Sequence, residues 1–293
     1  AALRGRATAH AQAQNYAAAI ADFSAALALN PKDIAALEGR GMAALQSGNF
    51  ASATTDFSLL EALRPGDGAP LFFRANARLQ NGDFSEAEAD FSSFLEIHTE
   101  DAEALMGRAL ARQSTGDHIG AEADLSALLA KVPEAARPLA SRGYVRLMLG
   151  RYEGSGSDLA QAMALPDAPP ELALWRFIAE TRGGQKAEAV LTTAAKKLRS
   201  DQWPAPVMHY FLGSISGDEV LTAATREPEG RPGRLCEAYF FLGEAALILN
   251  EPIGAARLFK AAVATGMTRY TEYAAAKAEL ARIDTAAGDS KSR

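Results

Sequence analysis

The fold is decided by residues 34–67, which read IAALEGRGMAALQSGNFASATTDFSLLEALRPGD. This stretch contains two segments with apolar residues at helical spacing, joined at residues 47–49 and closed by Pro65 and Gly66. The same pattern returns 34 residues earlier and 34 residues later, so that Arg40 is matched by Arg6 and Arg74. A fixed period of this length predicts a stacked array of helix pairs.

Composition narrows the class of protein. The 293-residue chain is 48% hydrophobic, which is enough apolar material for a core. Its formal net charge of −6 argues against nucleic acid as a partner, because nucleic-acid-binding domains present a basic surface. No run approaches the roughly 18 apolar residues of a membrane span, so we do not expect a protein integral to the membrane. The single cysteine, Cys236, excludes an internal disulfide.

The repeats predict one helical array over residues 1–203 and a less regular C-terminal third. The units are about 1–33, 34–67, 68–101, 102–135 and 136–169, followed by a degenerate unit at 170–203. An irregular helical connector follows at 204–235, then a last unit with a capping helix at 236–286 and a frayed tail at 287–293. The capping helix is expected over residues 270–283, with Lys277, Glu279 and Arg282 on its solvated face.

Small residues, aromatic residues and a proline stand at fixed places in each unit, as Ala53, Phe57 and Pro65 do in the second. At a period of 34 residues this pattern resembles the tetratricopeptide repeat (TPR) over most of the chain. The resemblance implies an all-α fold, namely a superhelical solenoid of stacked helix-turn-helix repeats that ends in a capping helix.

A narrower resemblance concerns residues 205–283. The segments HYFLGSISGDEVLTAA (209–224) and AYFFLGEAALILNEPIGAARLFKAAVATGM (238–267) are similar to the end of the NlpI family of bacterial outer-membrane lipoproteins. That family is an all-helical TPR scaffold that dimerises and brings proteases to cell-wall hydrolases. The resemblance favours a periplasmic or outer-membrane-associated location over the cytoplasm. Because Ala1 falls inside a repeat, we expect a processed or truncated start, and a lipid anchor upstream of Ala1 is left open.

Two charged residues recur in phase with the repeat. The arginines are Arg6, Arg40, Arg74, Arg108, Arg142 and Arg176, and the aspartates are Asp22, Asp56, Asp90, Asp124 and Asp158. In TPR units an apolar packing residue is usual at the arginine position, so the resemblance implies partly buried guanidinium groups that need partners. We interpret the two series as a structural ladder of ion pairs. The alternative is an arginine stripe that binds a carboxylate or phosphate ligand.

The TPR resemblance also implies a peptide-binding groove, because the first helix of each TPR unit lines the concave surface. The implied lining is Met42, Phe72, Asn76, Met106, Leu110, Tyr144, Leu147, Trp175, Ile178 and Phe240. Exposed apolar surface of this kind marks an interaction site. The alternative is that a helix from the C-terminus of the chain, or from a second copy, already fills the groove. Carboxylate clamping is not expected, since Phe72 and Met106 stand where basic residues would be needed.

Catalytic chemistry finds no support in the residue pattern. The four histidines, His10, His98, His118 and His209, fall at unrelated points of the repeat, and Cys236 has no base beside it. Residues 154–157 read GSGS but lack the preceding strand and the lysine of a phosphate-binding loop. We expect no catalytic residues, no metal ligands and no cofactor.

The sequence therefore predicts a non-enzymatic scaffold or adaptor that binds a partner protein or peptide in an apolar concave groove. The resemblance to NlpI implies that its partners include enzymes of the bacterial envelope. The main alternative is a structural subunit of a larger assembly, or a homodimer, whose groove is permanently occupied. A weaker alternative is a lipid or small-molecule carrier that uses the lining of Phe72, Met106 and Trp175.

Overall fold

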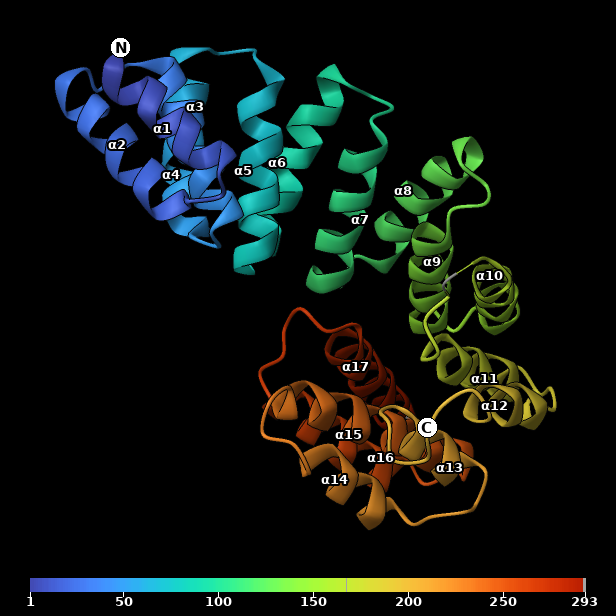
Figure 1. Ribbon diagram of the computed structural model, residues 1–293. Coiled ribbons are helices and arrows are strands. Elements are labelled where there is room, and N and C mark those ends of the chain that lie inside the picture. The colour runs from blue at the N-terminus through green and yellow to red at the C-terminus, as the bar shows by residue number, and fades with distance from the viewer. Residues whose placement is uncertain (167, 292–293) are drawn as a thin grey trace. The chain divides into compact units, whose positions relative to one another are not determined.

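A computed structural model of the chain describes residues 1–166 and 168–291, with side chains through residue 286. Within these residues it contains 17 α-helices and no β-strand (Figure 1). The all-α prediction is confirmed. The helices fall into two compact units, Ala1–Thr115 and Gly116–Arg293, which are described in turn.

The first unit consists of seven helices, and each pair of consecutive helices packs together. They are α1 (Ala2–Gln12), α2 (Tyr16–Leu29), α3 (Ile34–Gln46), α4 (Phe50–Leu63), α5 (Gly68–Asn81), α6 (Phe84–Ile97) and α7 (Ala102–Thr115).

Short turns of constant geometry connect the helices within each repeat. The residue before the cap of the second helix is left-handed, with φ of 58° at Gln14, 77° at Gly48 and 91° at Gly82. Glycine adopts this conformation at low cost, which explains its recurrence at 34-residue spacing. Asn49 then caps α4 by accepting a hydrogen bond from the Ser52 N–H at 3.3 Å. Turn chemistry therefore sets the same helix-to-helix connection in each repeat.

Aromatic rings on the second helix of one repeat pack against the first helix of the next. The Phe23 ring lies against Gly39, where an added Cβ would meet it at 2.2 Å, and the Phe91 ring lies against Gly107 in the same way, at 2.3 Å. Between these two contacts the corresponding pair is Phe57 and Phe73, whose rings stack at 5.5 Å. The close approach of consecutive repeats thus depends on a glycine that faces a phenylalanine at two of these three contacts.

Three of the recurring arginines, Arg40, Arg74 and Arg142, each bind an aspartate of their own repeat and a serine of the preceding repeat. The Arg74 guanidinium donates to both carboxylate oxygens of Asp90, at 2.8 and 2.7 Å, and to the Ser58 hydroxyl of the preceding repeat at 3.2 Å. Asp90 is buried and also accepts from Arg78. One guanidinium therefore joins the two helices of its own repeat and the last helix of the repeat before it.

The same arrangement recurs along the chain. Further pairs, given with their closest distances, are Arg6 with Asp22 (2.6 Å), Arg40 with Asp56 (2.6 Å) and Arg142 with Asp158 (2.8 Å). The serines that receive the arginines of the following repeat are Ser24, Ser58, Ser92 and Ser126. Arg108 belongs to the first unit and Asp124 to the second, so their pairing stays a prediction. Arg176 instead binds Glu180 on its own helix, at 2.6 Å.

The second unit continues the helix pairs and then departs from them. Its helices are α8 (His118–Lys131), α9 (Ala136–Met148), α10 (Tyr152–Ala164), α11 (Leu172–Arg182), α12 (Glu188–Ala195), α13 (Ala205–Phe211), α14 (Gly217–Thr225), α15 (Arg231–Ile248), α16 (Pro252–Ala264) and α17 (Thr271–Lys291). The tail predicted for residues 287–293 lies outside the residues whose side chains are described.

The core of the second unit forms where the C-terminal helices meet α9 and α11. Helix α17 packs against α9, α15 and α16, and α15 packs against α11. Trp175 of α11 lies at the centre, with ring centroids 4.6 Å from Tyr144, 4.9 Å from Phe240 and 5.7 Å from Phe241. Large buried aromatic rings of this kind dominate the hydrophobic stabilisation of a core.

Replacing Arg74 by alanine tests the contribution of the arginine and aspartate pairs. The Arg74 side chain is 13% exposed, whereas that of Arg6 is 63% exposed. We expect Arg74→Ala to lower the free energy of unfolding by about 2 kcal/mol, between the values for buried and exposed pairs. Arg6→Ala, the matched control, should have a clearly smaller effect in the same urea titration. Equal losses for the two variants would contradict a role for burial.

Replacing Gly107 by alanine tests the contact between consecutive repeats. Alanine in a helix normally stabilises by up to about 1 kcal/mol relative to glycine. At Gly107 the new methyl group would collide with the Phe91 ring, so we expect a net loss of about 1–3 kcal/mol. Gly5 of α1 has open space around it, and Gly5→Ala should stabilise the chain. Urea unfolding of both variants measures whether each change raises or lowers the free energy of unfolding. Stabilisation by Gly107→Ala would contradict the proposed contact.

Candidate functional site

The predicted groove residues of the first unit lie on its first helices and remain partly accessible. Met42 of α3, Phe72 and Asn76 of α5, and Leu110 of α7 are half-buried, whereas Met106 of α7 is buried. The Phe72 ring packs against the Phe91 and Phe94 rings of its own repeat. The Asn76 amide donates to the Phe72 carbonyl oxygen at 2.9 Å. These side chains form an ordered surface, and binding of a peptide to it stays a prediction.

The predicted groove residues of the second unit are placed differently. Leu147, Trp175, Ile178 and Phe240 are fully buried, and only Tyr144 keeps partial exposure. The prediction that these four side chains line an open groove was wrong, because α15 and α17 pack on the face of α9 and α11 where they lie. The alternative considered from the sequence, a groove filled by the chain's own C-terminal helices, describes this unit. With Trp175 buried, the lipid-binding lining proposed around it does not form.

A network of four charged side chains fastens α17 in this position. Arg182 of α11 donates to Glu244 of α15 at 3.0 Å and to Glu279 of α17 at 2.6 Å. Arg282 of α17 lies 2.8 Å from the same Glu279 carboxylate oxygen. Glu244 and Glu279 are both buried, and ion pairs in such surroundings are costly to break because a buried charge is left without a partner.

Arg282 extends the network to the end of α9. Its guanidinium donates to the carbonyl oxygens of Leu147 and Met148, at 3.1 and 2.9 Å, which are the last residues of that helix. A cation at this place satisfies free carbonyl groups and complements the helix dipole. The sequence prediction that Glu279 lies on a solvated face was wrong. Its charge is buried because two arginines, one of them 97 residues away, neutralise it.

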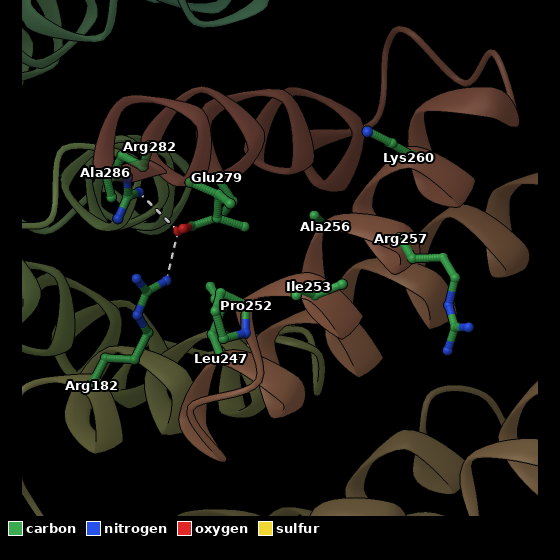
Figure 2. Close-up of a pocket in the computed structure, with 11 residues that line it drawn as sticks. Arg182, Leu247, Pro252, Ile253, Ala256, Arg257, Lys260, Glu279, Arg282 and Ala286 are labelled. Atoms are coloured by element: carbon green, nitrogen blue, oxygen red, sulfur yellow. Dashed lines mark hydrogen bonds and ion pairs between the residues drawn. The ribbon is translucent and has the colours of Figure 1, made fainter. Parts of the chain in front are cut away.

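Beside this network, α16 and α17 enclose a groove of about 830 Å³ (Figure 2). The side chains from α16 that line it are Ile253, Ala256, Arg257 and Lys260, and those from α17 are Glu279, Arg282, Ile283 and Ala286. Both sets follow the spacing i, i+3, i+4 and i+7, so each helix turns one face to the groove. Leu247 of α15 and Pro252, the first residue of α16, complete the apolar part of the lining.

The two ends of the groove differ in charge. In Figure 2, Glu279 points between Arg182 and Arg282 at one end, while Arg257 and Lys260 stand at the other. Arg257 and Lys260 form no ion pair with any described residue. Ile253 is 88% exposed, which is unusual for a large apolar side chain beside a groove. The arrangement suits an apolar surface with negative charge at its edge.

Sequence reasoning did not identify this groove. The spacing of Ile253, Ala256 and Lys260 was visible, but it is equally compatible with an ordinary solvated helix face. What makes it a groove is the position of α17, which depends on contacts with α9 and α11.

Comparison with known proteins agrees with the helix-pair architecture. Residues 4–68 and 74–118 match the family described as tetratricopeptide repeat. The chain is also similar to the lipoprotein NlpI homolog of Haemophilus influenzae, with 32% identity over 118 residues. That match covers 39% of the chain and 38% of the length of the relative.

Solved structures show the same fold. A tetratricopeptide repeat protein from Parabacteroides merdae superposes with a TM-score of 0.59 at 19% identity, over 83% of this chain and 97% of the other. YrrB, described as a TPR protein with an unusual peptide-binding site, superposes with a TM-score of 0.52 at 17% identity, over 56% of this chain and 86% of its own. The prediction of tetratricopeptide repeats is confirmed, and so is the partial resemblance to NlpI. Within the described part of the chain, every helix is too short or too polar to span a lipid bilayer.

The pH dependence of stability tests the buried network. Burial raises the pKa of Glu244 from 4.5 to about 8, with the Glu279 carboxylate adding to the rise and Arg182 opposing it. Because the folded chain holds this proton more tightly than the unfolded chain, the stabilisation is complete below pH 4.5 and is lost as the pH rises toward 8. Glu244→Gln should remove this slope, so its stability relative to wild type should increase with pH.

Both tryptophans lie in the second unit, so urea unfolding followed by tryptophan fluorescence reports on it. The exposed Glu229→Gln variant serves as the matched control and should follow wild type at every pH. Parallel stability curves for wild type and Glu244→Gln would contradict the raised pKa of Glu244.

Proposed function

We propose that this chain is a non-enzymatic adaptor that binds an amphipathic helix of a partner protein in the groove between α16 and α17. The observation that carries the proposal is an apolar groove of about 830 Å³ next to an isoleucine that is 88% exposed. TPR proteins generally mediate protein–protein interactions, and stacked repeats create extended binding surfaces. The proposal that the ligand is an amphipathic helix rests on the geometry and charge of this groove.

A helix is the ligand shape that fits two parallel rows of side chains. The rows from α16 and α17 both have the spacing i, i+3, i+4 and i+7. A third helix laid between them would bury Ile253 and Ile283 against its own apolar face, which is the usual way in which a groove binds an amphipathic helix. Burial of such anchors in the centre of an interface supplies most of its binding energy.

The positive charges of Arg257 and Lys260 indicate which side chains the bound helix should carry along its edge. The charges of Arg182 and Arg282 are balanced by Glu244 and Glu279 inside the network. Arg257 and Lys260 lack such partners among the described residues, so acidic side chains on the bound helix would complement them. The predicted occupant is therefore an amphipathic helix with an acidic edge.

The half-buried side chains Met42, Phe72, Asn76 and Leu110 of the first unit offer a second surface for the same role. An adaptor needs at least two binding surfaces to bring partners together, and linked binding sites raise the effective concentration of each partner. Because the partially similar Haemophilus influenzae relative is a lipoprotein, we place this adaptor in the bacterial envelope, where it would recruit envelope enzymes.

A photo-reactive amino acid at position 253 tests the groove as the binding site. In a lysate of the source organism, we expect it to cross-link to an acidic amphipathic helix of another protein, identified by mass spectrometry. Ile253→Glu should reduce capture of that protein about tenfold or more, because a carboxylate would be buried in the apolar contact. Ile119 of α8, which is 68% exposed, provides the matched control, and Ile119→Glu should capture as wild type does.

Two outcomes would contradict this assignment. Cross-links from position 253 that map only to a second copy of the chain would indicate a homodimer contact in place of a partner site. Equal capture by wild type and Ile253→Glu would place the binding surface elsewhere.

A further inference from the structure

A second cavity of the second unit, of about 450 Å³, combines aromatic walls with carboxylates. Its aromatic lining is Tyr144, Trp175, Trp203 and Tyr270, and its acidic lining is Glu171, Glu237 and Glu272. These side chains come from α9, α11, α15, the start of α17 and the segments before α11, α13 and α17. None of them takes part in the groove between α16 and α17.

The aromatic side chains are held in fixed orientations. The Tyr144 and Trp175 rings lie 4.6 Å apart at an angle of 47°. The indole N–H of Trp203 donates to Glu237 at 2.6 Å, which orients both side chains. Faces of tryptophan and tyrosine rings carry negative potential and attract cations, most strongly where water is excluded.

The carboxylates lack balancing positive charge. Glu272 is 8% exposed and, like Glu171 and Glu237, forms no ion pair with any described residue. The single cation of the lining, Arg269, is itself exposed. Burial raises the pKa of Glu272 to about 8, with Glu237 adding to the rise and hydrogen bonds with its own backbone and with the Trp175 side chain opposing it. Burial also raises the pKa of Glu237. A cation bound beside these groups would stabilise their ionised forms, which burial otherwise disfavours.

The arrangement favours an organic cation over a metal ion. Among the described residues, no three acidic, histidine or cysteine side chains are placed to hold one metal ion together. The cavity is also larger than a metal ion needs, and its walls include four aromatic rings. Aromatic rings combined with carboxylates are the chemistry that recognises alkylammonium and guanidinium groups.

We propose that this cavity binds an organic cation, an alkylammonium or guanidinium group, through the faces of Trp203 and Tyr144 and the carboxylates of Glu237 and Glu272. The group comes either from a lysine or arginine side chain of a bound polypeptide or from a free amine. The site shares no lining residue with the adaptor groove, so each of the two proposals can be tested without the other.

Intrinsic tryptophan fluorescence can report binding at this site. The chain contains two tryptophans, Trp175 and Trp203, and both line the cavity. Tryptophan emission is therefore titrated with acetyl-arginine amide, acetyl-lysine amide, spermidine and choline at constant ionic strength. We expect a saturable change with at least one cation and none with the neutral control acetamide. A stronger response to the amino-acid amides indicates a polypeptide source, and a stronger response to spermidine or choline indicates a free amine.

Variants test whether the carboxylates carry the binding. Glu237→Gln and Glu272→Gln should each weaken the response about tenfold. Glu229→Gln makes the same change in the exposed loop before α15 and should bind as wild type does. Circular dichroism checks that each variant is folded, and Glu171→Gln, at the partly exposed edge of the cavity, replaces any variant that is not. No response to any cation, or equal affinity in wild type and the glutamine variants, would overturn the proposal.

Discussion

Two arginines and two glutamates in the interior of the second unit hold its last helix in place. Arg182 binds Glu244 and Glu279, and Arg282 joins Glu279 to the final carbonyl groups of α9. Each charge depends on the others, because removing one leaves its partner buried and unpaired. Through this network three helices that are distant in the chain, α11, α15 and α17, share one set of contacts. The burial of Trp175 and the groove beside α16 both depend on where the network places α17.

The two candidate sites of the second unit have opposite electrostatic preferences. The groove between α16 and α17 offers apolar side chains and two cations, Arg257 and Lys260, that form no ion pair with any described residue. The aromatic cavity at the start of α17 offers carboxylates without balancing cations. Both include side chains of α17, one set from its first turn and the other from residues 279–286. A single helix that only caps the core would not need either arrangement, and this supports a binding role for the C-terminal region.

The regular repeats end where their ion pairs change. From Arg40 to Arg142, each described arginine pair joins two helices of one repeat, and a serine of the preceding repeat receives the same guanidinium. Arg176 has no aspartate at the matching position, which is Thr192, and binds Glu180 on its own helix. Beyond this point the C-terminal helices pack back on the array, α15 against α11 and α17 against α9. The repeating array therefore ends at Arg176, which binds a glutamate of its own helix in place of an aspartate on the next helix.

The sequence by itself determined the helix pairs, their turns and the pairing of Arg40 with Asp56 and of Arg74 with Asp90. These features were predictable because the partners lie 16 residues apart, within one helix hairpin, and the 34-residue period repeats the same local geometry. Only the tertiary structure decided that Trp175 and Phe240 are buried and that Glu279 faces inward. Those positions depend on contacts between residues 62 to 135 positions apart, such as Arg182 with Glu244 and Arg282 with Leu147. A periodic pattern describes a helix and its neighbours, whereas the same amphipathic face can lie against solvent or against a distant helix, and only packing selects between the two.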